Sequence, residues 1–225
     1  MSYISVAIDG PSGAGKSTLA KAIAAKLNYL YVDTGAIYRT IGCYAFRKGV
    51  DPRDAEAVTA LLPEVQISMN YGDDGLQHMY LNGEDVTGDI RMHEISRYAS
   101  DVSAHPAVRA FLLEMQRQLA RENHVIMDGR DIGTVVLPDA NVKIFLTATP
   151  EERARRRWRE LEQRGTPQPY EKVLADIQTR DFNDTNRPVA PLRQAEDAVL
   201  LDTTELNFAE SEAAIMTLIK GKIGE

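Results

Sequence analysis

Residues 10–18 read GPSGAGKST, which places glycine, lysine and serine at the spacing Gly-x-x-x-x-Gly-Lys-Ser. Glycines let the backbone adopt positive φ and approach a ligand closely, so successive N–H groups can surround an anion. A helix that begins at about Gly15 would add its own unpaired N–H groups and its positive dipole end. Lys16 would put a charge at the β- and γ-phosphates of a nucleotide, and the Ser17 hydroxyl would ligate Mg²⁺. The stretch predicts a nucleotide-phosphate loop made of Gly10, Pro11, Ser12, Gly13, Ala14, Gly15, Lys16, Ser17 and Thr18.

A second polar group, DGRDIGT at 128–134, follows the apolar run 124–127. A carboxylate at the end of a strand beside the phosphate loop can hold the water shell of Mg²⁺. Asp128 and Ser17 are therefore the predicted metal ligands. A turn or capping aspartate is the alternative for Asp128. The chain has no Asn-Lys-x-Asp motif, which disfavours a GTPase.

Arginines concentrate in two later stretches. EERARRRWRELEQR at 151–164 holds six Arg against four Glu, with Arg153 and Arg157 four residues apart. Such residues share a face of a helix. The stretch TRDFNDTNRP sets three residues at helical spacing, and they share a face if the helix extends that far: Arg180, Asp184 and Arg187. Arginine suits the charge that develops in phosphoryl transfer, because its fork is rigid and always charged. A solvated, ion-paired surface is the alternative for both stretches.

The elements that must position these residues alternate along the chain. Apolar, strand-like runs occur at 3–8, 29–32, 124–127, 142–146 and 198–201. Helix-period stretches occur at 16–27, 36–48, 106–121, 151–163, 170–182 and 208–220. Strands separated by helices are typical of a parallel sheet with helices on both faces.

Two segments depart from this rhythm. Residues 62–88 contain VQISMN, the turn-like YGDDG and LQHMYLNG, which predict a small antiparallel insert of two strands. The Pro- and Gly-containing QRGTPQPY at 163–170 predicts a mobile loop between two helices.

Length and charge limit the function further. The chain has 225 residues, which fits one domain with an insert, and a net charge of −7, which argues against a general nucleic-acid binder. The single cysteine, Cys43, excludes an internal disulfide and is expected to be buried. No basic leader and no long apolar run is present, so we expect a cytoplasmic protein that does not contact membranes.

Five motifs now occur in one order: GPSGAGKST, DTGAIYR (33–39), DGRDIGT, EERARRR (151–157) and TRDFNDTNRP (179–188). Together they closely resemble the bacterial cytidylate kinase family of nucleoside monophosphate kinases, over essentially the whole chain. DTGAIYR and DGRDIGT are specific to that family, whereas the phosphate loop is not. Thr34 stands where some members carry Ser, and both side chains offer a hydroxyl.

The resemblance implies an α/β fold of three layers, with a parallel central sheet of about five strands, helices on both faces, a small antiparallel insert and a helical lid. It implies one P-loop kinase domain over 1–225. The core would comprise 1–33, 102–150 and 185–225, the acceptor-binding region 34–101 and the lid 151–184. It further implies transfer of the γ-phosphoryl group of ATP to CMP or dCMP with Mg²⁺, by a monomer.

Site residues follow from the resemblance position by position. Thr34, Arg39 and Arg130 would contact the acceptor α-phosphate, with Tyr38 also at the substrate. Arg187 would lie near the transferring group, and Arg180 and Asp184 at the ribose and phosphate. Arg153 and Arg157 would be lid arginines on the ATP side. Ser100, Arg109 and Asp131 would read cytosine, since a carboxylate suits its amino group and an arginine its ring nitrogen. The expected catalytic residues are Lys16, Arg130, Arg157 and Arg187.

Two other functions remain possible from the residues alone. One is a P-loop kinase for a different small acceptor, which would have no reason to keep Arg109 and Asp131. The other is a module that binds ATP without turnover, which would not need the arginine clamp.

Overall fold

The computed structural model describes residues 3–72 and 77–224. The chain divides into two compact units, one formed by Met1–Tyr31 with Glu122–Glu225 and the other by Val32–Arg121. We call them the nucleotide unit and the insert unit, and each is described by itself.

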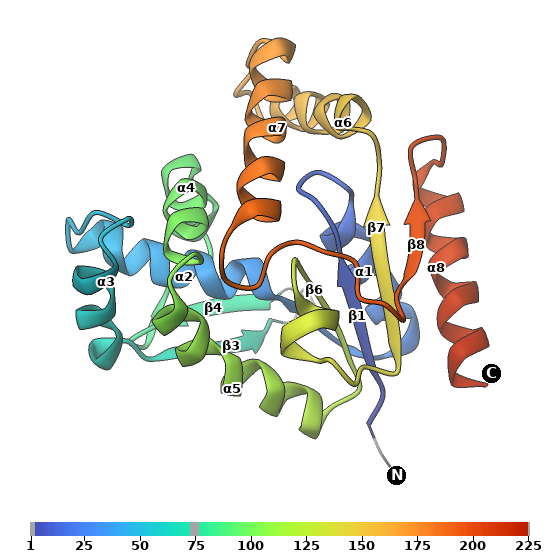
Figure 1. Ribbon diagram of the computed structural model, residues 1–225, viewed down its shortest axis with the longest axis horizontal. Helices are drawn as coiled ribbons and strands as arrows, with labels where there is room; N and C mark the ends of the chain where they lie inside the picture. Colours follow the sequence, from blue (N-terminus) through green and yellow to red (C-terminus); the bar gives the residue numbers. More distant parts are fainter. Residues whose placement is uncertain (1–2, 73–76, 225) are drawn as a thin grey trace. The chain divides into compact units, whose positions relative to one another are not determined.

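The sheet that carries the phosphate loop has the strand order β2-β6-β1-β7-β8 (Figure 1). Its strands are β1 (Ser5–Asp9), β2 (Leu30–Asp33), β6 (Val125–Gly129), β7 (Val142–Thr147) and β8 (Val199–Asp202). β1 pairs in parallel with β6 and β7, and β7 with β8. In the central pair, Asp9 lies opposite Gly129, so the loops after β1 and β6 leave the same edge of the sheet. This is the edge at which α/β proteins bind ligands.

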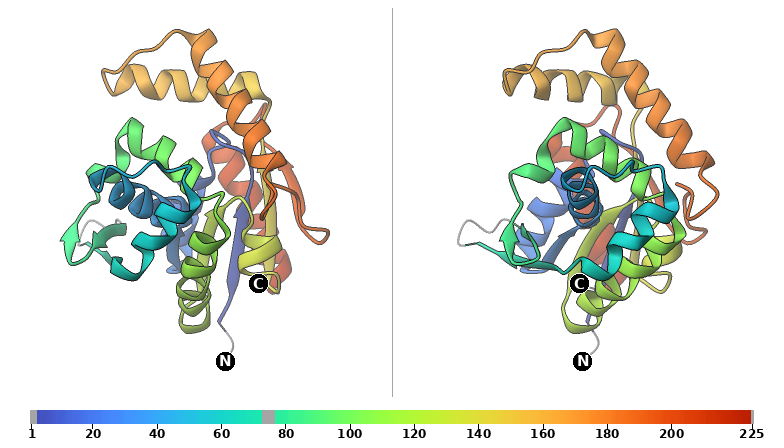
Figure 2. Two further views of the ribbon diagram at one scale, coloured as in Figure 1. Left: turned by 60° about the vertical axis from the view of Figure 1, so that its left-hand side comes forward. Right: turned by 90° about the vertical axis from the view of Figure 1, so that its left-hand side faces the viewer.

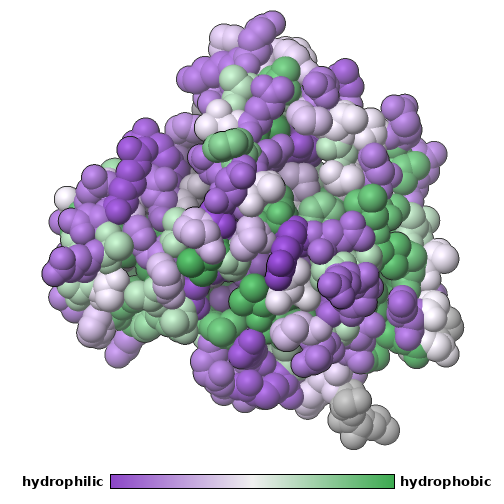
Figure 3. Space-filling view, in the orientation of Figure 1, coloured by the Kyte–Doolittle hydropathy of each residue, from purple (hydrophilic) through white to green (hydrophobic). Residues whose placement is uncertain are grey.

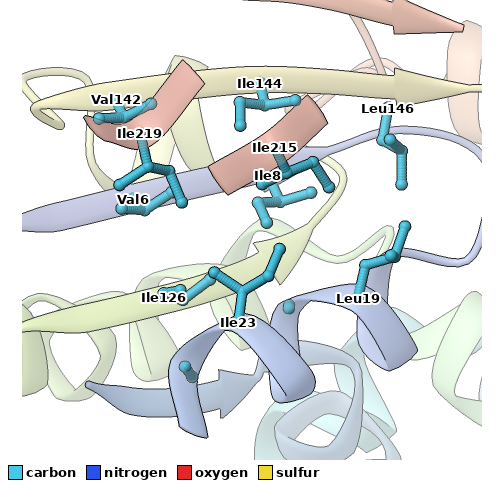
Figure 4. Packing of buried hydrophobic residues seen from close by; sticks show 12 residues of the cluster. Val6, Ile8, Leu19, Ile23, Ile126, Val142, Ile144, Leu146, Ile215 and Ile219 are labelled. Carbon is cyan, nitrogen blue, oxygen red and sulfur yellow. The ribbon is translucent and has the colours of Figure 1, made fainter. Parts of the chain in front are cut away.

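The helices of the nucleotide unit are α1 (Lys16–Leu27), α6 (Pro150–Gln163), α7 (Tyr170–Asn186) and α8 (Phe208–Ile223), with a π-helical turn at Ile132–Val136. α1 packs on β6 and α8 on β7, and the two helices contact each other. Figure 4 shows the core that they enclose, with Ile8 of β1, Ile23 of α1 and Ile215 of α8 among its fully buried members. This core holds the strand ends that carry the site.

α6 and α7 form a helical hairpin in which the two helices pack against each other, as both views in Figure 2 show. Ala154, Val173 and Ile177 form its buried centre, with Trp158 packed against them. Hydrophilic side chains predominate over these two helices in the view of Figure 3. The loop 164–169 joins them without helix or strand, as the Pro and Gly content predicts.

The insert unit contains α2 (Thr34–Arg47), α3 (Ala55–Leu61), α4 (His93–Val102) and α5 (Pro106–Glu122). It also contains an antiparallel sheet in the order β3 (Ile67–Tyr71), β4 (Gln77–Leu81), β5 (Glu84–Asp85), and short 3-10 turns at Leu62–Glu64 and Asp89–Arg91. α2 and α4 touch so closely that a Cβ at Gly42 would lie 2.9 Å from the amide nitrogen of Ala99. The unit is therefore built around this helix pair.

The expected α/β fold and the antiparallel insert are confirmed. The insert has three strands where two were expected, and part of the turn predicted at 71–75 lies outside the described residues. α3, α4 and the π-helical turn were not predicted. α5 belongs to the insert unit except for its last residue, Glu122, whereas residues 102–122 were expected in the core; that division of the chain stays a prediction. Cys43 is buried and free, and no helix in the described part of the chain is long and apolar enough to cross a membrane.

Candidate active site

The phosphate loop begins where β1 ends. Gly10 has φ 147°, and a Cβ there would overlap the carbonyl oxygen of Leu146 on β7, so no other residue fits. Gly15 has φ 87° and is the N-cap of α1, which begins at Lys16. The helix N-terminus therefore opens directly onto the loop, as the spacing of the motif predicts.

Lys16 is buried at the centre of this loop. Its Nζ donates to the carbonyl oxygen of Pro11 at 2.8 Å. Burial, followed by the positive charge of Arg130, lowers the pKa of Lys16 to about 7. A bound phosphate would offset both effects, so the surroundings of Lys16 favour an anionic ligand.

Ser17 and Asp128 meet, as expected of two ligands of one metal ion. The Ser17 hydroxyl donates to Oδ2 of Asp128 at 2.8 Å, across 111 residues of sequence. The hydroxyl of Tyr31 donates to Oδ1 of the same carboxylate at 2.9 Å. Both residues offer the hard oxygen atoms that Mg²⁺ prefers, and one or two protein ligands are typical of Mg²⁺ beside nucleotide phosphates.

Arg130 and Asp184 form a buried ion pair next to this group. Nε of Arg130 donates to Oδ2 of Asp184 at 2.8 Å. Burial raises the pKa of Asp184, but the charges of Arg130 and Arg180 outweigh it and hold that pKa below its usual value. Arg180 and Asp184 lie one turn apart on α7, so they share a face as expected.

Arg187 departs from the expected arrangement. α7 ends at Asn186, and Arg187 is its C-cap with ψ 140°, so it does not continue the helical face of Arg180 and Asp184. Its side chain instead turns to Asp131, with Nη2 3.4 Å from Oδ1, while its Nε donates to the carbonyl oxygen of Ala190 at 2.6 Å. Asp131 therefore has a buried arginine partner within the nucleotide unit.

The two expected lid arginines have different surroundings. Arg153 is buried, and its guanidinium bonds to Ser12 O at 3.0 Å, to Ala148 O at 2.8 Å and to both carboxylate oxygens of Asp181 at 3.0 and 2.6 Å. Arg157 is partly exposed and pairs with Glu160 on its own helix at 2.8 Å. Arg153 thus joins the phosphate loop, α6 and α7, which sequence spacing does not reveal.

Asp9 is a functional candidate that the motifs missed. Its carboxylate accepts the backbone N–H groups of Ile132 and Gly133, both at 2.7 Å. Burial raises the pKa of Asp9 to about 6. The available signal was a charged residue at the end of an otherwise apolar buried strand, immediately before Gly10.

The expected acceptor residues of the insert unit lie on its helices α2, α4 and α5. Thr34, Tyr38 and Arg39 lie on the first turns of α2, whose N-cap Asp33 also accepts from Nη2 of Arg39 at 2.8 Å. The Arg109 guanidinium lies 5.4 Å from the ring centroid of Tyr38. Ser100 lies on α4 and is half-buried. The structure thus brings Tyr38 and Arg109 together, and the roles of these residues stay predictions.

Comparison with known proteins identifies the family. The family model described as cytidylate kinase matches residues 6–221. The chain belongs to the cytidylate kinase family. It is 49% identical to the cytidylate kinase of Caldicellulosiruptor bescii over 97% of this chain and 96% of that protein. It is 47% identical to that of Bacillus velezensis over 97% of each. A crystal structure of an uncharacterized protein from Eubacterium ventriosum is 13% identical with a TM-score of 0.51, over 96% of this chain and 98% of that chain, a likeness of fold alone. The family expected from the motifs is confirmed.

Proposed function

We propose how the residues described above carry out the reaction of this family. As a cytidylate kinase, the protein transfers the γ-phosphoryl group of ATP to CMP or dCMP, giving CDP or dCDP and ADP. It is a nucleoside monophosphate kinase, and ATP and the nucleoside monophosphate are its small-molecule substrates.

The phosphate loop holds the ATP phosphates. The backbone N–H groups of Gly13–Ser17 and the α1 N-terminus surround the β-phosphate, and Lys16 places its charge on the β- and γ-phosphates. The Arg153 tie to Ser12 fixes the loop from behind. Of the two expected lid arginines, Arg157 is partly exposed and Arg153 is buried, so we assign Arg157 to direct contact with ATP.

Mg²⁺ fits Ser17 and Asp128. The Ser17 hydroxyl would bind the ion directly and the Asp128 carboxylate would hold its water shell, and the 2.8 Å contact between the two side chains supports this assignment. When bound, Mg²⁺ neutralises charge on the β- and γ-phosphates. Tyr31 orients the Asp128 carboxylate through the other oxygen.

Transfer itself needs positive charge around the moving phosphoryl group and no covalent intermediate. We assign this to Arg130, Arg180 and Arg187, and aspartates of the nucleotide unit pair with Arg130 and Arg187. Asp184 fixes Arg130 and Asp131 faces Arg187, so each guanidinium keeps donors for a phosphate while its charge is balanced before substrate binds.

The acceptor assignments rest on the family motifs. Thr34, Tyr38 and Arg39 would hold CMP, and Ser100, Arg109 and Asp131 would read cytosine. The Asp131–Arg187 pair offers a second role for Asp131, which is to position a phosphate clamp. A monomeric state and a cytoplasmic location stay predictions.

The observation that carries this proposal is the Ser17–Asp128 hydrogen bond beside buried Lys16, since it joins the two motifs of a nucleotide–Mg²⁺ site. A coupled ADP-release assay with CMP, UMP, AMP or no acceptor tests it. We expect rapid turnover with CMP that requires Mg²⁺. Equal rates with all acceptors would indicate a different kinase, and ATP binding without turnover would indicate a sensing module.

A further inference from the structure

Asp9 connects two loops that leave the same edge of the sheet. Its backbone leads directly into Gly10 of the phosphate loop, and its side chain binds the residues that follow Arg130 and Asp131. The two 2.7 Å contacts use one carboxylate oxygen each, so each oxygen of Asp9 binds one of the two backbone N–H groups.

The turn is packed tightly around this contact. A Cβ added at Gly133 would lie 3.3 Å from Oδ2 of Asp9 and 3.2 Å from Cδ of Lys143. Asp9 is itself almost fully buried. A side chain at residue 133 would therefore press on both the Asp9 carboxylate and the alkyl chain of Lys143.

We propose that Asp9 is a positioning residue for the acceptor: its carboxylate sets the backbone after Asp131 and thereby fixes how Arg130 and Asp131 meet CMP. The proposal rests on the proposed function of Arg130 and Asp131. It concerns geometry, because Asp9 touches neither residue's side chain through any hydrogen bond described above.

A buried carboxylate beside a phosphate loop could instead be a general base, and the geometry argues against that role. Both oxygens of Asp9 already accept backbone N–H groups and the side chain is almost fully buried, so the geometry favours a structural tie. The acceptor in this reaction is a phosphate oxygen, which carries no proton at neutral pH that must be removed. The carboxylate of Asp9 is nonetheless buried, and a buried charge destabilises the fold unless hydrogen bonds compensate it. A carboxylate offers a separate acceptor oxygen to each of these two N–H groups, whereas an amide has only one acceptor oxygen.

The test is Asp9→Asn, which keeps the volume but turns an NH₂ group toward one of the two N–H donors. Steady-state kinetics with CMP, UMP and ATP should show a KM for CMP raised about tenfold, the size of one lost hydrogen bond to a charged group. KM for ATP should stay within about twofold, since the phosphate loop is held by its own backbone. The ratio of kcat/KM for CMP to that for UMP should fall. Asp139→Asn, an exposed aspartate of the same unit, is the matched control and should change nothing.

Two further variants separate the possible outcomes. Gly133→Ala should reproduce the Asp9→Asn phenotype in weaker form, and it keeps the proposal testable should Asp9→Asn not fold. The double variant Asp9→Asn/Asp131→Ala should have the same ratio of kcat/KM for CMP to that for UMP as Asp131→Ala alone, because both substitutions act on base discrimination through the side chain of Asp131.

If Asp9→Asn lowered kcat and left KM for CMP unchanged, the proposal would be overturned and Asp9 would act as a general base. If Asp9→Asn raised only KM for ATP, the proposal would be overturned and Asp9 would act by positioning the phosphate loop. If wild type did not phosphorylate CMP, or Asp131→Ala kept full base discrimination, the proposed function would fail first. If those two behave as expected and Asp9→Asn does not, only the role of Asp9 fails.

Discussion

The phosphate loop after β1 and the turn after β6, residues 129–133, are held in different ways. The phosphate loop is held mainly by its own backbone, through positive φ at Gly10 and Gly15 and the bond from Lys16 to Pro11 five residues away, and Arg153 of α6 adds a bond to Ser12. The turn after β6 depends on side chains from elsewhere: Asp9 from β1 and Asp184 from α7.

Because the two loops are held differently, substitutions at different places in the molecule should disturb them. A loop held by its own backbone is altered by changes within it, whereas a loop held by distant side chains is altered from a distance. We therefore expect variants in the first to affect ATP and catalysis directly. Variants around the second should affect the acceptor while leaving ATP binding nearly intact.

The largest expected effect lies in the phosphate loop. Lys16→Ala should lower kcat at least about a hundredfold, because it removes a charged donor from the transferring phosphates in a buried site. Stopped-flow or coupled-assay turnover measures it. Lys21→Ala, an exposed lysine of the same helix, is the control and should retain wild-type turnover. A folded Lys16→Ala enzyme with near-normal turnover would contradict the assignment of this loop.

The second prediction concerns Asp131, in the turn after β6. If its carboxylate accepts the amino group of cytosine, Asp131→Ala should cut kcat/KM for CMP by roughly 10- to 1000-fold and that for UMP much less. Arg130→Ala should lower both and leave their ratio nearly unchanged, since a phosphate clamp serves both acceptors alike.

The pairing with Arg187 supplies the competing outcome. If Asp131 acts only by holding Arg187, then Asp131→Ala and Arg187→Ala should both depress CMP and UMP equally. The ratio of the two acceptors, measured in these variants, decides between reading the base and organising the phosphate site.

The same contrast explains how far sequence alone could reach. The phosphate loop, α1 and the five strands were predictable, because glycine conformation, helix capping and apolar runs are local properties. The contacts of Asp9 with Ile132 and of Arg153 with Ser12 span 123 and 141 residues, so no local pattern contains them. The π-helical turn at Ile132–Val136 begins at the residue whose N–H group Asp9 binds, and it was missed as well.

The arginine-rich helix shows the limit most clearly. Arg153 and Arg157 have the same residue type and the spacing of one helical face, yet one is a buried tie and the other a partly exposed ion pair. Arg153 reaches Asp181 on α7 and the carbonyl oxygens of Ser12 and Ala148, and sequence spacing contains none of these contacts. Spacing predicted a shared helical face and the family resemblance placed both arginines on the ATP side, but neither could predict which of them the fold already uses.

The third prediction tests that tie. Arg153→Ala leaves the Asp181 carboxylate and the Ser12 carbonyl oxygen without their donor, and should lower the free energy of unfolding by about 3 kcal/mol. Arg159→Ala, an exposed arginine of the same helix, should change it by less than about 0.5 kcal/mol. Urea unfolding of the two variants measures both. Equal stabilities would mean that Arg153 is not part of the framework and is available to ATP.

The smallest expected effect is a pH dependence that belongs to the turn after β6 and not to the phosphate loop. Burial raises the pKa of Asp9 from an ordinary value of 3.8 to a net value of about 6, against the lowering effect of the N–H groups of Gly133 and Ile132. The charge of Asp131 contributes to the rise, and that of Lys16 opposes it. Between these two values the folded protein holds a proton that the unfolded chain has released. Stability from this group is therefore greatest at low pH and falls as the pH rises through about 6.

Asp9→Asn removes that titration. The unfolding free energy of wild type minus that of the variant should consequently fall by about 2 kcal/mol between pH 4.5 and pH 7, whatever the offset between the two proteins at either pH. Asp139→Asn should show no such slope. A difference that stays constant across this range would mean that Asp9 is ionised throughout, held so by its two N–H donors. The tie between β1 and the turn would then carry no cost in stability at neutral pH.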